Sequence, residues 1–193
     1  RVAGPLVAAL VFGGLATQLP DAFGSALKRR YPPGEQLFWH EEGVQTTVSV
    51  HIRPMGGRLL YLNGLHQASD GPDVLRVHRL IGLLPLALHP DPRRVLVVGL
   101  GGGATAGAAS RHRDTQVDVV ELSDSVVRGA AWFAHVNEDV LVNPKVTLRV
   151  DDGRNYLMLT DRRYDVITAD LIQPEHAGAG NLFSREYFQL ARR

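Results

Sequence analysis

Acidic side chains stand at the ends of three strand-like apolar runs in this sequence. They are Glu121 after Val117–Val120, Asp151 and Asp152 after Val146–Val150, and Asp170 after Val166–Ala169. A carboxylate in such a place can accept hydrogen bonds from ribose hydroxyls, reach an adenine amino group, or take a proton from an amine. A single acid of this kind is more often a solvated loop residue or a helix cap.

A glycine-rich turn precedes these acids. The apolar run Val95–Val98 leads into Gly99-Leu100-Gly101-Gly102-Gly103-Ala104. Such a turn lets the backbone approach a ligand and presents free N–H groups at a helix start, although it can also serve only as a tight strand–helix junction. A dinucleotide site competes for this pattern, but the glycines are closer together than in G-x-G-x-x-G, and the acids would repel a pyrophosphate. We therefore expect an adenosyl ligand near Gly99, Gly101 and Gly103.

The elements that must position these residues alternate between strand and helix. After an expected helix over Asp73–Leu88, the pattern predicts strands over Val95–Val98, Val117–Val120, Val146–Val150 and Val166–Ala169, with helices over Ala104–His112, Ser125–His135 and Tyr156–Leu159. This order indicates an α/β fold with a parallel sheet, whose strand ends meet at one edge. A small antiparallel β unit is expected before it, over residues 36–66.

The chain divides into three predicted parts: 1–30, 31–72 and 73–193. Residues 2–19 carry no charge, and Lys28, Arg29 and Arg30 follow them. We interpret this segment as the end of a membrane region facing the cytoplasm, attached to the inner membrane; an amphipathic or buried helix is the alternative. Residues 31–72 form the β unit, and residues 73–193 form a nucleotide-binding domain.

Composition excludes several classes of function. The formal net charge of +1 gives no basic field for nucleic acid, and the absence of cysteine excludes disulfides and thiolate metal sites. With 45% hydrophobic and 21% charged residues, the chain has the composition of a globular domain. We expect no metal ion.

The motifs together resemble the spermidine synthase (polyamine aminopropyltransferase) family, from about Gln36 onwards. The matching residues are Val44-Gln45, Asn63-Gly64-Leu65-His66-Gln67, His78, Gly99–Gly103, Glu121, Asp152-Gly153, Asp170-Leu171-Ile172-Gln173-Pro174 and Leu182-Phe183-Ser184-Arg185-Glu186-Tyr187-Phe188. With its apolar lead-in, the chain is most similar to the membrane-fused branch. The resemblance implies a Rossmann-like S-adenosylmethionine-dependent transferase sheet behind a small N-terminal antiparallel β unit.

The resemblance also assigns roles to these residues. Decarboxylated S-adenosylmethionine, or S-adenosylmethionine, would be the co-substrate, held by Gln45, Gly99, Gly101, Gly103, Glu121, Asp152 and Gly153. Asp170 would be the proton acceptor or the group that orients a small amine, possibly a polyamine, with His78, Gln67 and Gln173 on the substrate side. His78 is also explained as an ordinary polar residue on a helix. A homodimer is a further expected state.

The sequence departs from the family pattern on the amine side. The aspartate of the glycine turn is replaced by Gly102, the Tyr and Glu that flank the histidine by Val77 and Arg79, and the second gate-loop aspartate by Gln173. Since a dication would then be poorly compensated, we expect putrescine to be a poor substrate. An S-adenosylmethionine-dependent methyltransferase and a non-catalytic adenosyl-binding domain are the rival functions.

Overall fold

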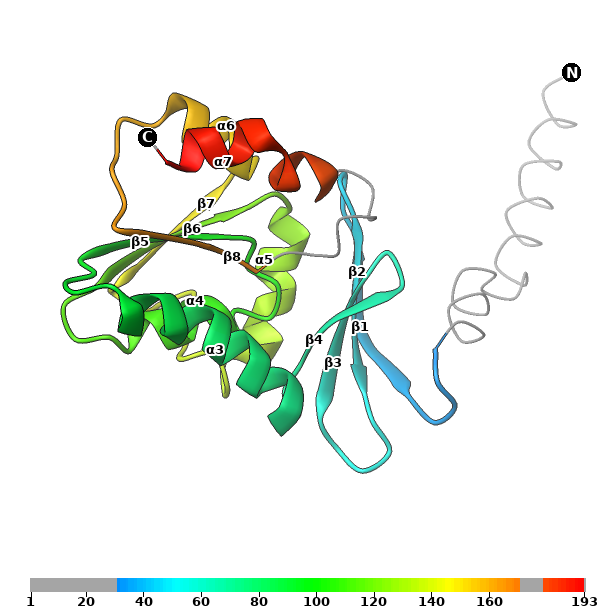
Figure 1. Cartoon of the computed structure of the whole chain (residues 1–193). Coiled ribbons are helices and arrows are strands. Elements are labelled where there is room, and N and C mark those ends of the chain that lie inside the picture. The colour runs from blue at the N-terminus through cyan, green and yellow to red at the C-terminus, as the bar shows by residue number, and fades with distance from the viewer. Residues whose placement is uncertain (1–30, 171–178, 193) are drawn as a thin grey trace, which may run out of the picture. The chain divides into compact units, whose positions relative to one another are not determined.

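The computed structural model describes residues 31–170 and 179–192 of the chain. Every described strand and helix lies within residues 34–193, which form one compact unit (Figure 1). In chain order these are β1 (Gln36–Glu42), β2 (Thr47–Ile52), β3 (Arg58–Leu62), β4 (Leu65–Ser69), α3 (Pro72–Leu88), β5 (Arg94–Val98), α4 (Ala104–Ser110), β6 (Gln116–Glu121), α5 (Asp124–Ala130), the 3-10 turn η1 (Ala131–Phe133), β7 (Val146–Val150), α6 (Gly153–Leu159), β8 (Val166–Ala169), η2 (Ala179–Phe183) and α7 (Arg185–Ala191).

The N-terminal sheet is antiparallel, with the strands in the order β1-β2-β3-β4. The sequence predicted an antiparallel unit over residues 36–66, and the last strand, β4, extends beyond that range to Ser69. Asn63 and Gly64, both with positive φ (50° and 76°), form the two-residue connection between β3 and β4. An Asn-Gly pair between two strands is a strong hairpin signal, so the sequence did contain the information for this strand.

The second sheet is parallel, with the order β7-β6-β5-β8. This confirms the α/β class predicted from the alternation of strands and helices, and the small antiparallel sheet before it. Val95 and Val97 of β5, and Val117 and Val119 of β6, are fully buried, as expected for strands covered on both faces.

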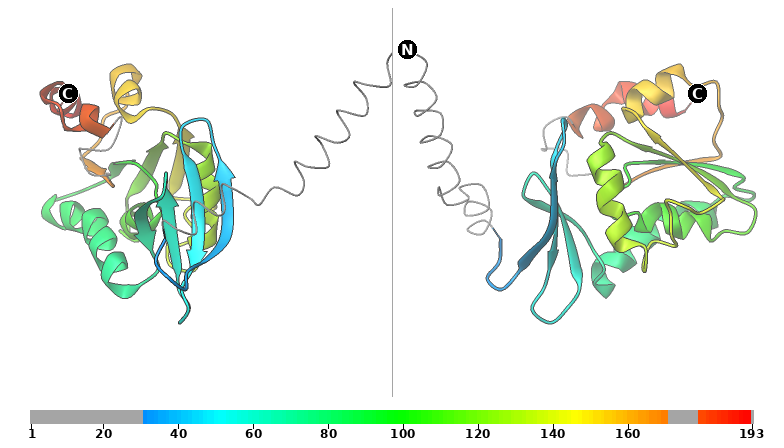
Figure 2. Two further views of the ribbon diagram at one scale, coloured as in Figure 1. Left: turned by 90° about the vertical axis from the view of Figure 1, so that its right-hand side faces the viewer. Right: turned by 180° about the vertical axis from the view of Figure 1, so that it is seen from behind.

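Helices cover both faces of the parallel sheet (Figures 1 and 2). On one face, side chains of α3, α4, α5 and η1 pack in a single core with the buried valines and with β2 and β3 of the N-terminal sheet. On the other face, Leu96, Val98 and Val120 pack against Tyr156 of α6. The two sheets therefore share one hydrophobic core, which fixes the N-terminal sheet beside the parallel strands.

Three helix boundaries differ from the prediction. The helix predicted to end at His112 ends at Ser110, and the one predicted through His135 ends at Ala130 and continues only as η1. α6 begins at Gly153, three residues before the prediction, because the side chain of Asp152 accepts a hydrogen bond from Asn155 N (2.8 Å) and caps the first turn.

The apolar segment expected at a membrane, residues 2–19, lies outside the described residues. Within residues 31–170 and 179–192, the structure contains no helix with the length and apolar character needed to cross a bilayer.

Candidate active site

The acidic residues and the glycine turn meet at one edge of the parallel sheet. Three backbone hydrogen bonds continue the sheet's ladder at this edge: Gly99 N to Val120 O (2.8 Å), Asp151 N to Glu121 O (2.9 Å) and Asp170 N to Val98 O (2.9 Å). Asp151, Glu121, Gly99 and Asp170 therefore stand in a row across the four strands. The sequence predicted that these strand ends would meet, and the strand order confirms it.

Glycine is required in the turn for reasons of space and conformation. Gly99 has φ +87°, and a Cβ atom there would lie 2.8 Å from the carbonyl oxygen of Asp170. Gly103, with φ +83°, is the residue before the first turn of α4, and a Cβ there would meet Asn137 and Val140 at 2.8 Å. These glycines bring the turn close to the end of β8 and make it compact. Gly101 lies between them, also with positive φ.

Glu121 is buried at the end of β6 and turned toward the glycine turn. One carboxylate oxygen accepts a hydrogen bond from Leu100 N (2.7 Å) and the other from Ser123 N (3.0 Å). Burial raises the pKa of this carboxyl, while the backbone N–H groups around it act in the opposite direction. The backbone of Gly101 and of Leu122 also acts on the carboxylate, so Glu121 is surrounded by the N–H groups of the glycine turn and of its own strand end.

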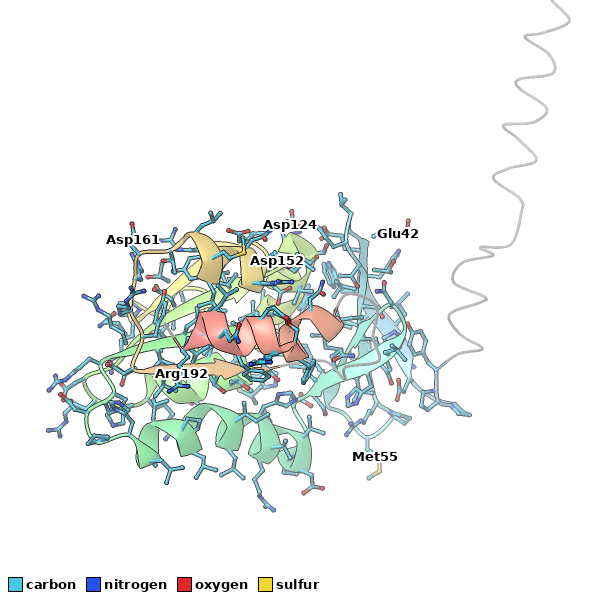
Figure 3. All side chains as sticks on the ribbon, turned by 45° about the horizontal axis from the view of Figure 1, so that its top comes forward. Glu42, Met55, Asp124, Asp152, Asp161 and Arg192 are labelled. Atoms are coloured by element: carbon cyan, nitrogen blue, oxygen red, sulfur yellow. The ribbon has the colours of Figure 1, made fainter. Side chains whose placement is uncertain are left out.

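Asp152 and Gly153 lie at the junction of β7 and α6, where Figure 3 shows Asp152 at the start of the helix. The carboxylate of Asp152 caps α6, as the structural alternative for a lone acid anticipated. A Cβ on Gly153 would lie 2.5 Å from a methyl group of Val98, so glycine allows α6 to start directly against β5. The cap is made by one carboxylate oxygen of Asp152, Oδ1.

Gln45 lies in the turn between β1 and β2 and is exposed. A hydrogen bond from Gly43 N to Thr46 O (3.0 Å) closes the turn. The turn packs closely against α5, because a Cβ on Gly43 would lie 1.9 Å from Ser125 Oγ. The turn that contains Gln45 therefore lies against the start of α5, which follows Glu121 in the chain.

Asp170 and His78 form the polar centre of the site. Asp170 Oδ1 lies 2.8 Å from His78 Nδ1, and the two side chains are 8% and 16% exposed. The hydrogen bond with Asp170 raises the pKa of His78, burial acts against this, and the charge of Asp170 and the backbone of Gln67 add to the rise. His78 therefore carries a proton more readily than an ordinary histidine, and both predicted residues belong to one cluster.

Thr105, in the first turn of α4, completes this cluster. Its hydroxyl lies 3.0 Å from Asp170 Oδ2 and 3.0 Å from the carbonyl oxygen of His78, and the residue is buried. The sequence did not single out Thr105. The available signal was a hydroxyl one residue after the start of the helix that follows the glycine turn, which by itself points to no chemistry.

The structure shows what surrounds the positions where acids of the family are replaced. A Cβ on Gly102 would lie 2.9 Å from the Cβ of Ala68, with the ring of Phe133 at 3.7 Å, so an aspartate does not fit. Arg79 donates to the carbonyl oxygen of Val136 (3.2 Å), and Val77 is exposed. The change at Gly102 is thus accompanied by an apolar wall that the sequence alone did not reveal.

Asn137 is a second buried residue that the sequence did not indicate. Its amide nitrogen donates to the carbonyl oxygens of Gly102 (3.0 Å) and Ala130 (3.1 Å), which ties the glycine turn to the end of α5. The remaining predicted residue, Gln173, lies outside the described part of the chain. Among the residues that the structure does describe, no three His, Asp or Glu side chains gather as metal ligands would.

Comparison with known proteins agrees with this geometry. Residues 74–193 match the spermine/spermidine synthase domain family. A polyamine aminopropyltransferase of Methanocaldococcus jannaschii is 34% identical over 134 residues, which cover 69% of this chain and 45% of that protein. One of Klebsiella pneumoniae is 27% identical over 177 residues, which cover 91% of this chain and 59% of that protein. The chain spans about half the length of these curated relatives.

Solved structures show the same fold at lower identity. A spermidine synthase in complex with the transition state analogue AdoDATO superposes with a TM-score of 0.75 at 21% identity, covering 81% of this chain and 54% of that one. A spermidine synthase from Thermotoga maritima gives a TM-score of 0.70 at 20% identity, covering 81% and 52%. The fold is therefore the Rossmann-like one predicted, and the chain belongs to the spermine/spermidine synthase family.

Proposed function

We propose that this chain transfers an aminopropyl group from decarboxylated S-adenosylmethionine to an amine. The observation that carries the proposal is the placement of Asp170 on the same strand-end edge as Glu121, with the glycine turn between them. Relatives named polyamine aminopropyltransferase, and a neighbour solved with a transition state analogue, support the proposal.

The donor would lie along the glycine turn. In this proposal Glu121 binds the ribose hydroxyls, because two vicinal hydroxyls facing one carboxylate form charge-assisted hydrogen bonds. Asp152 and Gly153, at the neighbouring strand end, receive the adenine, and Gln45 approaches from the N-terminal sheet.

The chemistry requires positioning and one proton acceptor. The lone pair of a neutral amine attacks the methylene carbon next to the sulfonium, a C–N bond forms, and the C–S bond breaks with its electrons moving to sulfur. The products are methylthioadenosine and an alkylated ammonium, whose proton passes to the Asp170 carboxylate. Asp170 is suited to this step because its orientation is held by two neighbouring side chains.

The acceptor would be smaller or less cationic than putrescine. Of the acids that the family places around the amine, the described residues retain Asp170, and its charge is shared with His78. Ala68 and Phe133 fill the space beside Gly102, so that side offers no carboxylate to a second ammonium. A dication would then lose more hydration free energy than it gains from contacts in the site.

A product assay tests the proposal. The full chain is incubated with decarboxylated S-adenosylmethionine and a panel of mono- and diamines, and methylthioadenosine and the alkylated amine are measured together. We expect product from at least one amine, and little from putrescine. Efficient spermidine formation would contradict the acceptor class. Tight donor binding without product from any amine would contradict the transfer and favour a ligand-binding domain.

We also infer, from the sequence, attachment to the cytoplasmic face of the inner membrane through residues 2–19. The support is their lack of charge and the basic residues that follow. The test is fractionation of the protein expressed with its native upstream sequence. Recovery without detergent would contradict attachment.

A further inference from the structure

Thr105 is the residue that links the three elements around Asp170. It belongs to α4, its hydroxyl contacts the carbonyl oxygen of His78 in α3, and it contacts the carboxylate of Asp170 after β8, each at 3.0 Å. Thr105 is 1% exposed. A buried hydroxyl with two acceptors and no route to solvent has its orientation decided by the protein around it.

The contact with Asp170 complements the one made by His78. His78 Nδ1 holds Oδ1 at 2.8 Å, and Thr105 Oγ1 holds Oδ2 at 3.0 Å, so each carboxylate oxygen has its own partner. One partner alone would leave the carboxylate free to rotate about its bond to Cβ. With both partners, the plane of the carboxylate is fixed. Oδ2 also lies near the glycine turn, since a Cβ placed on Gly101 would be 3.8 Å from it.

We propose that Thr105 is a positioning residue that fixes the carboxylate of Asp170 for proton transfer from the acceptor amine. This inference rests on the proposed function of Asp170, and it adds a residue to the site. Thr105 acts through Asp170 and need not touch either substrate. Such support matters because a small misplacement of a reacting group lowers the reaction rate strongly.

The same contact acts on a carboxylate that His78 also holds. The hydroxyl has one proton to share between Asp170 Oδ2 and the carbonyl oxygen of His78, so its removal takes away the partner of Oδ2 and leaves that of Oδ1 in place. Among the described residues, the ionisable groups that act on the His78–Asp170 pair are the two partners themselves and His66 of β4, while α4 contributes the uncharged Thr105. Substitutions at Thr105 leave His66 and His78 in place.

The test compares Thr105→Val with Thr105→Ser in the full chain. Valine keeps the shape and removes the hydroxyl, whereas serine keeps the hydroxyl. We expect Thr105→Val to lower kcat about 10- to 100-fold, the usual range for the loss of a hydrogen bond to a charged group, without change in the KM for the donor. Thr105→Ser, which keeps the contact with Asp170, should restore most of the activity.

Thr115→Val is the matched control. Thr115 is also fully buried and also donates to a carbonyl oxygen, that of Pro92 (2.6 Å), but it precedes β6 at the opposite end of the sheet. Thr115→Val should lose stability without a change in kcat or in the ring signals of His78. An equal kinetic effect of both valine variants would show that Thr105 is only a packing residue and would overturn the proposal.

A readout independent of turnover separates this inference from the proposed function. Nitrogen NMR of the His78 ring reports its hydrogen bond with Asp170 Oδ1, and Thr105→Val, which leaves the carboxylate free to rotate, should change the Nδ1 signal. If the wild-type chain makes no product but this signal changes, the proposed function fails and the positioning contact stands. If product forms and neither the signal nor kcat changes, the positioning role is wrong. Should Thr105→Val not fold, Thr105→Ala against Thr105→Ser carries the same comparison.

Discussion

The two halves of the candidate site are constructed in different ways. On the donor half, Glu121 and Asp152 are held by backbone N–H groups within a few residues of their own strand ends or in the adjacent turn. On the acceptor half, Asp170 is held by side chains from two helices, His78 and Thr105, that lie far from it in the sequence. The donor half therefore depends on local chain geometry, and the acceptor half depends on how α3, α4 and β8 pack.

The two halves also differ in charge. Glu121 is a buried carboxylate without a cationic partner among the described residues, and it is stabilised by backbone dipoles. Asp170 lies against the imidazole of His78, which balances the negative charge of Asp170 when the ring is protonated. In the proposed function, the first half therefore suits neutral hydroxyl and amino groups, and the second half offers little compensation to a cation. Substitutions on each half test that difference.

The largest effect is expected for Asp170→Asn. Removal of the proton acceptor should lower transfer by roughly 10²–10⁴-fold, the range associated with a general base, while donor affinity stays near that of the wild type. Steady-state assays and calorimetry with methylthioadenosine measure the two quantities. Asp161→Asn, at an exposed carboxylate beyond α6, is the control. A parallel loss of donor binding would mean that the two halves are not separable.

Glu121→Gln should affect the other half. We expect adenosyl-ligand affinity to fall by about 1.5–3 kcal/mol, because a charge-assisted acceptor is lost and the amide must place an NH₂ group against Leu100 N or Ser123 N. Calorimetry with methylthioadenosine provides the measurement, with Glu138→Gln at an exposed site for reference. Unchanged affinity would remove Glu121 from the donor site.

Gly102→Asp tests whether packing excludes the missing aspartate. The new side chain would meet Ala68 and Phe133, so we expect a loss of about 1–3 kcal/mol in the free energy of unfolding, as for other overpacked sites. Adding Ala68→Gly should make space, so the double variant should cost less than the sum of the two single changes. Denaturant unfolding measures this. If Gly102→Asp left the free energy of unfolding unchanged, contacts with Ala68 and Phe133 would not explain why glycine stands at this position.

The smallest effect is the pH dependence of the His78–Asp170 pair. Because the pKa of His78 is raised above its ordinary value of 6.5, the folded state binds a proton that the unfolded chain releases. The stabilisation is fully present below about pH 6.5 and is lost as the pH rises through the raised folded-state pKa. Asp170→Asn should lower the His78 titration midpoint in NMR spectra, without affecting signals of His135. A midpoint that does not respond would show that the two side chains do not interact in solution.

Much of the fold could be predicted because it depends on local patterns. The valine-rich runs became β5 to β8 in a parallel sheet, and the acids that follow them meet at one edge. The helix boundaries were less predictable. The end of α5 at Ala130 and the start of α6 at Gly153 depend on hydrogen bonds and caps at single residues, which hydrophobic periodicity does not report.

The sequence by itself determined the class of site. Glycines that need positive φ, followed by an acid after each later strand, specify a turn and a row of carboxylates wherever the parallel sheet forms, because strand ends are a local property of the chain. Only the tertiary structure decided what surrounds Asp170 and Gly102. Thr105, Ala68 and Phe133 come from three different elements, and their contacts arise from side-chain packing between elements, for which sequence spacing carries no signal.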